Sequence, residues 1–226
     1  MSVELKKRII TSVILLASFF LMTCYNYLLL TGLIFFSVIV WIEFNGLIIR
    51  IIKPKKNILR FYASLFKFIA FIYIFYFSYI TTLNLSIDQT HKVIFVFLLG
   101  VCVASDIGGL IFGKIFKGKK LTKISPNKTI SGSIGSFIFS FLLIPIYYKF
   151  DFNLTYLELF SVTLVTSIFS QAGDLFISYL KRKAKVKDTG DLLPGHGGFL
   201  DRFDGILFGV PLGLFYTLLI LPNLNL

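Results

Sequence analysis

Long apolar segments alternate with short polar connections along almost the whole chain. Seven segments have the composition, and most of them the length, of membrane-spanning helices, which need about 20 predominantly apolar residues. They cover residues 9–22, 28–49, 61–83, 93–112, 130–148, 157–180 and 203–221. This pattern predicts an all-α, polytopic membrane bundle of about seven helices, within a range of six to eight. Polar and glycine residues at positions 105–109 are expected to interrupt the fourth span.

The amino-acid composition supports a membrane location. Hydrophobic residues make up 56% of the 226 residues, 27 of which are Phe, and the mean hydropathy is +0.84. Soluble domains contain only about 45–50% apolar residues. A basic start followed by an apolar segment resembles a signal peptide, but the second apolar segment follows directly. We therefore expect a helical hairpin that stays in the membrane, and a single membrane domain over residues 1–226.

The positive charges lie mainly on alternate connections between the apolar segments. With seven spans, 20 of the 23 Lys and Arg residues fall on the side that includes the N-terminus. Such an excess predicts that this side is cytoplasmic. A net charge of +12 would suggest nucleic acid in a soluble protein, but here membrane orientation explains it, and we expect no nucleic-acid partner.

One stretch, residues 178–204, is far more polar than the rest of the chain. Counting Asp174 just upstream, it gathers five carboxylates, seven basic residues including His196, and four glycines. A charge held in the membrane costs about 2.5–3.5 kcal/mol or more unless it is paired, hydrated or used. The stretch therefore indicates a functional site, and the charge distribution places it on the cytoplasmic side.

Polar residues of the sixth apolar segment share one helix face. Asp174, Ser178 and Lys181 are spaced i, i+4 and i+7, and Gln171 lies three residues before Asp174. A carboxylate, a hydroxyl and an ammonium in one row suit a metal ion together with an anionic ligand. The structural alternative is that Lys181 extends toward water and Asp174 pairs with it.

A glycine-rich loop follows this segment. Pro194 sets a turn, and Gly195, Gly197 and Gly198 surround His196. Glycines let backbone N–H groups approach a phosphate closely, because no Cβ intervenes. The loop therefore favours phosphate binding, and the charged residues that follow it at once strengthen this interpretation.

Two carboxylates lie near the start of the last apolar segment. Asp201 and Asp204 are three residues apart, and a helix N-terminus favours negative charge, so helix capping is one explanation. Asp174 and Asp201, from two different helices, could instead share Mg²⁺, which prefers oxygen ligands and phosphates. On the residues alone both interpretations stay open.

These motifs together resemble the signature of phosphatidate cytidylyltransferases, also called CDP-diacylglycerol synthases. Residues 178–204 fill every fixed position of S-x-L-K-R-x-x-x-x-K-D-x-G-x-x-L-P-x-H-G-G-F-x-D-R-F-D. Residues 170–174 resemble the family's S-Q-x-G-D segment. Its earlier cytoplasmic motif is similar to the set Asp106, Gly113, Lys114, Lys119 and Lys120.

A further segment resembles the family with two departures. Residues 124–132, ISPNKTISG, are similar to the family's I-S-P-K-K-T-x-E-G. Asn127 stands where a basic residue is usual, and Ser131 stands where Glu is usual. In all, the resemblance covers about 100 residues, from Asp106 to Asp204.

The resemblance implies transfer of the cytidylyl group from CTP to phosphatidic acid, which gives CDP-diacylglycerol and pyrophosphate. It implies that Asp174 and Asp201 hold Mg²⁺, with K⁺ as a second cation, and that Lys181 and Arg182 are further catalytic residues. The substrate-binding residues that it implies are Ser178, Lys187, Asp188, His196, Gly197, Gly198, Arg202, Asp204, Asp106, Lys119, Ser125, Lys128 and Thr129. The implied partners are CTP, phosphatidic acid, membrane lipids and a second copy of the chain, in a bacterial inner membrane.

Alternatives remain at the level of residues and of function. The lysines of residues 114–128 follow equally well from the positive-inside rule, and Asp106 could pair with Lys67 inside the bundle. Cytidylyl transfer to an ether-linked or isoprenoid lipid phosphate is the nearest functional alternative. A transporter is the alternative from another class, although its polar residues would gather around a midplane site. We expect N-terminal hairpins at about 9–83 and a catalytic region at about 93–221.

Overall fold

The computed structural model describes residues 13–14, 17–18, 20–22, 24–52, 57–87, 89–122, 125, 128–149, 154–192 and 197–220. Its helices are α2 (Asn26–Ile52), α3 (Asn57–Ser86), α4 (Gln89–Phe116), α5 (Ile130–Phe141), α6 (Ile144–Tyr148), α7 (Tyr156–Lys183) and α8 (Leu200–Ile220). Within the described ranges no strand forms, and only an isolated antiparallel bridge joins Lys120 and Thr129.

The all-α membrane fold predicted from the hydrophobic pattern is confirmed. Among the described residues, six helical segments are long and apolar enough to cross a membrane, with Ile130–Tyr148 counted as one segment. They correspond to six of the seven predicted spans. Half of the first predicted span, residues 9–22, falls outside the described residues. The chain is therefore an integral membrane protein.

The described residues form two compact units. Unit 1 comprises Met1–Ser86 and Leu180–Phe203, and unit 2 comprises Ile87–Tyr179 and Asp204–Leu226. Unit 1 thus combines the α2–α3 hairpin with the connection between α7 and α8, including the helix ends that flank it. The expectation of one membrane domain with a catalytic region at about 93–221 stays a prediction.

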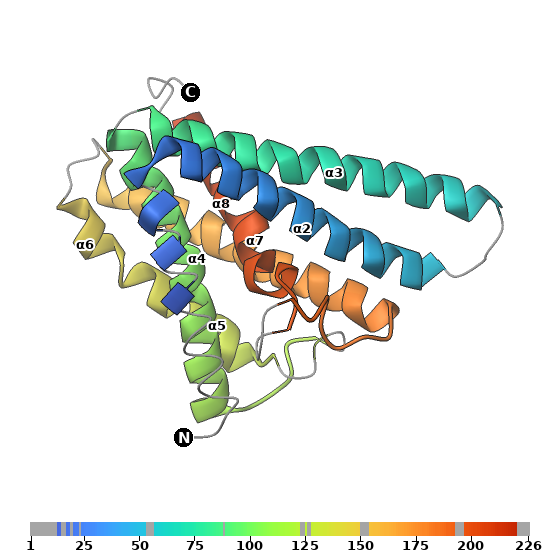
Figure 1. The fold of residues 1–226 in the computed structure, drawn as a ribbon. Helices are drawn as coiled ribbons and strands as arrows, with labels where there is room; N and C mark the ends of the chain where they lie inside the picture. Colours follow the sequence, from blue (N-terminus) through green and yellow to red (C-terminus); the bar gives the residue numbers. More distant parts are fainter. Residues whose placement is uncertain are drawn as a thin grey trace. The chain divides into compact units, whose positions relative to one another are not determined.

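In unit 1, α2 and α3 lie side by side as a hairpin (Figure 1). The buried face of α2 carries Phe36, Val40, Glu43 and Leu47, at the spacing of three and four residues that one helix face requires. The Ser37 and Ser78 hydroxyls are hydrogen-bonded at 2.6 Å between the two helices. Glu43 is therefore a carboxylate on an otherwise mostly apolar packing face.

An aromatic cluster attaches the start of α8 to this hairpin. The ring of Phe36 contacts Phe77 of α3, and it also contacts Phe199 and Phe203 edge-on, with ring centroids 5.6 and 4.9 Å away. Edge-to-face pairs contribute about 0.5–1.5 kcal/mol each beyond area burial. The segment that carries the signature residues is thus packed against α2 and α3 within unit 1.

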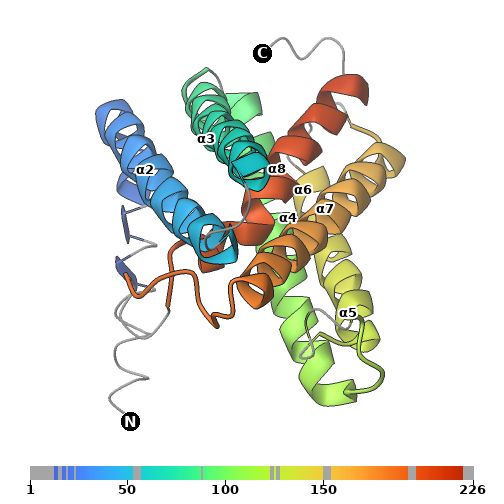
Figure 2. The ribbon, with the colours of Figure 1, turned by 90° about the vertical axis from the view of Figure 1, so that its right-hand side faces the viewer.

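In unit 2, α4 and α5 lie side by side at very short range (Figure 2). A Cβ added to Gly132 would come within 2.9 Å of the Gly109 carbonyl oxygen, and one added to Gly135 within 2.7 Å of the Gly108 oxygen. Small residues allow such close backbone approach between membrane helices. The prediction that the fourth span is interrupted is wrong: α4 is continuous, and its glycines serve packing against α5.

Glycines also allow α8 to pack closely on α7. Gly205, Gly209 and Gly213 recur every four residues, so they form one ridge. A Cβ at Gly205 would lie 2.7 Å from the Ser170 hydroxyl, and one at Gly209 would lie 3.2 Å from the Thr166 carbonyl. Further along α7, Gly173 leaves room for the Asp204 carbonyl of α8, which would be 2.6 Å from an added Cβ. Close packing thus fixes the part of α7 next to Asp174.

The fifth predicted span is broken between α5 and α6. Pro145 occupies the first turn of α6. Proline has no N–H and its ring clashes with the carbonyl four residues earlier, which here belongs to Phe141, the last residue of α5. The break therefore lies where the sequence contains the helix breaker.

Candidate active site

The predicted site residues are divided between the two units. Unit 1 contains Lys181, Arg182, Lys187, Asp188, Gly197, Gly198, Asp201 and Arg202. Unit 2 contains Asp106, Lys119, Ser125, Lys128, Thr129, Asp174, Ser178 and Asp204. His196, with Pro194 and Gly195, lies outside the described residues, so its assignment stays a prediction.

In unit 1 the signature residues are organised around Asp201 in the first turn of α8. Its Oδ1 forms an ion pair with the Lys181 ammonium at 2.6 Å. Its Oδ2 accepts hydrogen bonds from the backbone N–H groups of Thr189 at 2.8 Å and Gly198 at 3.2 Å. Because the Asp201 side chain is only 7% exposed, these donors replace the water that an ionised carboxylate would otherwise bind.

The Thr189 hydroxyl lies between two carboxylates. Its Oγ1 is 2.6 Å from Glu43 Oε2 and 3.1 Å from Asp201 Oδ2. A hydroxyl has one proton to donate, so the shorter contact to Glu43 takes it. Asp201 Oδ2 retains the two backbone donors.

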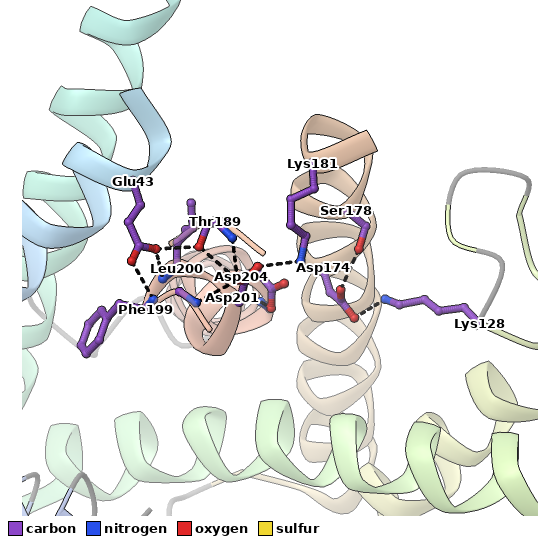
Figure 3. A network of polar contacts seen from close by, with 12 residues as sticks. Glu43, Lys128, Asp174, Ser178, Lys181, Thr189, Phe199, Leu200, Asp201 and Asp204 are labelled. Atoms are coloured by element: carbon purple, nitrogen blue, oxygen red, sulfur yellow. Dashed lines mark hydrogen bonds and ion pairs between the residues drawn. The ribbon is translucent and has the colours of Figure 1, made fainter. Parts of the chain in front are cut away.

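Glu43 is the site residue that sequence reasoning missed. From α2 its carboxylate also accepts hydrogen bonds from the backbone N–H groups of Phe199 at 2.9 Å and Leu200 at 2.8 Å (Figure 3). These N–H groups lie at the start of α8 and have no hydrogen-bond acceptor within the helix. The capping role that was considered for the aspartates is thus filled by a side chain of another helix. The sequence contains one indication of its importance: Glu43 is the only acidic residue between Glu4 and Asp88.

Helix α7 ends in a Schellman motif that turns the chain toward this network. Val186 N–H bonds to the Lys181 carbonyl at 3.0 Å, and Lys185 adopts the left-handed conformation at φ 58°. Four predicted site residues in this unit are exposed: Arg182, Lys187, Asp188 and Arg202. The turn thus presents cationic groups beside a carboxylate that is already fixed.

In unit 2 Asp174 is held by residues from two elements. Asp174 Oδ2 is paired with the Lys128 ammonium, and the Ser178 hydroxyl donates to Oδ1 at 3.3 Å, one turn along α7 (Figure 3). The Asp174 side chain is 30% exposed. Asp106 on α4 interacts electrostatically with both Asp174 and Lys128. Within unit 2 the structure therefore brings Lys128, Asp174 and Ser178 into contact, and Asp106 lies near enough to interact with this group electrostatically.

The basic connection between α4 and α5 is folded back on itself. Leu121 N–H donates to the Lys128 carbonyl at 2.8 Å and Ile130 N–H to the Lys119 carbonyl at 3.0 Å. Thr129 caps α5 by accepting from Gly132 N–H at 3.0 Å. This fold carries Lys128 to Asp174, whereas Lys119 is exposed and Ser125 is buried.

Ser131 stands where the family pattern usually has Glu, and its side chain has a local structural role. Its hydroxyl donates to the Lys117 carbonyl and is 3.0 Å from the Thr129 hydroxyl. It therefore ties the start of α5 to the residue that follows α4. The departure from the family pattern is thus accommodated by hydrogen bonds within the connection.

Gln171, predicted to share a face with Asp174, connects α7 to its neighbours. The Ser133 hydroxyl of α5 donates to Gln171 Oε1 at 2.5 Å. One turn earlier on α7, the fully buried Ser167 hydroxyl lies 3.2 Å from the Ser105 hydroxyl of α4 and forms a hydrogen bond with it. Hydrogen-bonded hydroxyls hold membrane helices together by about 0.6 kcal/mol each. The Gln171 side chain is therefore a link in the packing next to Asp174.

The two carboxylates assigned to cation binding each face a side-chain ammonium, Lys128 in unit 2 and Lys181 in unit 1. Carboxylate and hydroxyl oxygens, as at Asp174 and Ser178, are the donors that Mg²⁺ prefers. Among the described residues, no group of three or more His, Cys, Asp or Glu side chains that could hold a metal is found. A cation here would thus compete with lysine.

Comparison with known proteins gives a consistent family. The sequence model described as "Cytidylyltransferase family" matches residues 4–220. A protein of Staphylococcus haemolyticus named phosphatidate cytidylyltransferase is 49% identical over 128 residues, which is 55% of this chain and 48% of the relative. The protein of the same name from Staphylococcus aureus is 45% identical over the same shares.

A more distant relative agrees. A phosphatidate cytidylyltransferase of Rickettsia felis is 38% identical over 148 residues, which is 60% of this chain and 63% of the relative. The matches to the two staphylococcal proteins thus span about half of those proteins' length.

Proposed function

The chain belongs to the cytidylyltransferase family, and from this premise we propose that it transfers the cytidylyl group of CTP to phosphatidic acid, giving CDP-diacylglycerol and pyrophosphate. The names of the relatives support this substrate pair. The observation that carries the proposal is the ordered network of the signature segment around Asp201, flanked by exposed cationic side chains such as Arg182 and Lys187.

The reaction needs little help from a general base. The phosphate monoester of phosphatidic acid has a second pKa near 6 and is largely ionised at neutral pH. One of its oxygens bonds to the α-phosphorus of CTP. The bond from that phosphorus to the oxygen bridging to the β-phosphate breaks, and pyrophosphate leaves with the electron pair. The main barrier is therefore the approach of two polyanions.

The residues of the site suit charge neutralisation and positioning, which carry most of the catalysis in phosphoryl transfer. Lys181 and Arg182 at the end of α7 are proposed to bind substrate phosphates, together with Arg202. Lys181 is already fixed by Asp201 at 2.6 Å. A lysine held in this way loses little side-chain freedom when a phosphate binds beside it.

We assign Mg²⁺, with K⁺ as a second cation, to Asp174 and Asp201. The support is the pairing of each carboxylate with an ammonium in the structure and the hard oxygen donors around Asp174. When bound, such a cation would supply further neutralisation of the phosphate charge. Asp106, which interacts electrostatically with Asp174, would add negative potential that favours cation binding.

The proposed location is a bacterial inner membrane, with the N-terminus and the site on the cytoplasmic side. The excess of Lys and Arg on alternate connections supports this orientation. The acyl chains of the lipid would remain in the bilayer while CTP arrives from the cytoplasm. A homodimer stays a prediction, which a mass measurement of the detergent-solubilised protein tests.

The decisive experiment measures pyrophosphate release from CTP by the purified protein in mixed micelles. We expect release only with phosphatidic acid and Mg²⁺ both present, loss of release on chelation, and recovery when Mg²⁺ is restored. CDP-diacylglycerol should appear in equal amount. If pyrophosphate is released with ether-linked or isoprenoid lipid phosphates but not with phosphatidic acid, those lipids would be the substrates instead. No release with any lipid phosphate would overturn the proposed function.

A further inference from the structure

The carboxylate of Glu43 joins two parts of the signature segment that are ten residues apart. Its Oε2 accepts from the Thr189 hydroxyl at 2.6 Å and from Leu200 N–H at 2.8 Å, and its Oε1 accepts from Phe199 N–H at 2.9 Å. All three donors are neutral, and Glu43 is 9% exposed. Glu43 therefore ties Thr189 to the start of α8.

Two glycines of the signature make room for this carboxylate. A Cβ at Gly190 would lie 2.7 Å from Glu43 Oε1, and a Cβ at Gly198 would lie 2.8 Å from Glu43 Oε2 and 2.6 Å from the Gly190 backbone nitrogen. Cβ atoms essentially never lie this close to a non-bonded heavy atom. At Gly190 and Gly198 the missing side chain thus admits the Glu43 carboxylate.

The same carboxylate orders Asp201 indirectly. Thr189 donates its hydroxyl proton to Glu43 and its backbone N–H to Asp201, so the position of Thr189 depends on both. Gly198 N–H, which also donates to Asp201, immediately precedes the two N–H groups that Glu43 holds. Loss of Glu43 would release both backbone donors of Asp201 from their anchor.

We infer that Glu43 is a positioning residue, which holds Thr189 and the start of α8 so that Asp201 keeps the Lys181 ammonium in place for the substrate phosphates. The inference rests on the proposed function for its catalytic consequence. It gives the N-terminal hairpin a role in the reaction, because Glu43 comes from α2. Helix α2 would otherwise serve only as a membrane span.

The test compares Glu43→Gln with wild type. Glutamine has nearly the same shape, but its nitrogen cannot accept, so at least one of the three donors loses its acceptor. Loss of a hydrogen bond to a charged group is expected to lower kcat/KM for CTP by about 10- to 100-fold. We expect a raised KM for CTP, measured at a temperature at which both Glu43→Gln and the control are fully folded in detergent. Glu43→Asp, which keeps two acceptor oxygens, should recover part of the activity.

Glu158→Gln is a matched control. Glu158 also accepts a backbone N–H and a threonine hydroxyl at a helix start, from Thr155 at 2.7 and 2.8 Å. It lies 16 residues before Asp174 on α7, which is about 24 Å along the helix. Its variant should keep wild-type kinetics. Glu43→Gln activity equal to that of this control would overturn the inference, as would a loss of activity that only follows the loss of folded protein, with KM unchanged.

If Glu43→Gln does not fold, Thr189 carries the test. Thr189→Val removes only the hydroxyl that donates to Glu43 and should lower kcat/KM by about tenfold or more, while Thr189→Ser should restore it. Equal activities of the Val and Ser variants would contradict the role of this hydrogen bond.

Hydrogen exchange separates this inference from the proposed function. If wild type shows no cytidylyl transfer, the proposed function fails, but the anchoring can still be measured. Peptides containing Phe199 and Leu200 should exchange about tenfold faster or more in Glu43→Gln than in wild type, with α5 unchanged. Unchanged exchange at the start of α8, or faster exchange throughout the chain, would refute the anchoring by Glu43.

Discussion

Replacing Asp201 by Asn tests both the chemistry and the architecture of the site. Asp201 Oδ1 faces the Lys181 ammonium and Oδ2 faces the N–H groups of Thr189 and Gly198. An Asn side chain can keep its oxygen toward the two N–H groups, but its NH₂ group then faces Lys181. Because Lys181 is 15% exposed, it can turn toward water instead of staying buried without a partner.

The expected stability loss follows from this rearrangement. One charge-assisted hydrogen bond is lost, which costs about 1.5–3 kcal/mol, while the two backbone bonds survive. Asp174→Asn should cost at most about 1 kcal/mol, because Asp174 is 30% exposed and Lys128 is 26% exposed. Both variants should therefore fold, and Asp201→Asn should be the less stable of the two.

Both variants should lose activity to a similar degree. If the two carboxylates hold the cation and orient cationic side chains for the transition state, each substitution should lower kcat by about 100-fold or more. The assay is lipid-dependent pyrophosphate release, run beside detergent unfolding of the same preparations. Activity within tenfold of wild type in Asp174→Asn would refute its assignment as a cation ligand. Equal destabilisation of both variants would refute the burial argument for Asp201.

Three further variants test the packing and the helix ends. Gly135→Ala should destabilise the protein by about 1–3 kcal/mol, because the added Cβ overlaps Gly108 and Phe112. Gly46→Ala, with no atom within 4 Å of the added Cβ, should instead stabilise it by about 0.5–1 kcal/mol, and unfolding in detergent measures both. Lys185→Gly should stabilise by about 0.5–1 kcal/mol, since the residue is left-handed at φ 58°, and a lower unfolding temperature would contradict this.

The fold was largely predictable because hydrophobic length determines it. Six predicted spans became helices whose bounds differ from the expected ones by a few residues. The error at α4 has a physical cause, since glycine is a poor helix former in isolation but allows close packing between membrane helices. The sequence of α4 alone does not reveal that α5 brings Gly132 and Gly135 to the same contact.

The site was predictable where residues are close in sequence and not where they are distant. Asp174 and Ser178 contact each other as the helical spacing requires. The partners of the charged groups could not be read from spacing, because Lys128 reaches Asp174 through the folded connection after α4. Glu43 is 146 residues from Thr189, and only tertiary packing reveals their contact.

Asp174, Asp201 and Glu43 differ in the donors that they meet. Asp174 and Asp201 each face a lysine ammonium, which a metal cation can displace and a substrate phosphate can attract. Asp201 also accepts from two backbone N–H groups through Oδ2, so only its Oδ1 has an exchangeable partner. Glu43 meets a hydroxyl and two backbone N–H groups, and backbone groups cannot leave without opening the start of α8. Exchangeable partners suit groups that bind ligands, and fixed neutral partners suit a group that maintains a shape. The donors around each carboxylate thus distinguish the residues proposed to bind cations and phosphates from the residue proposed to position them.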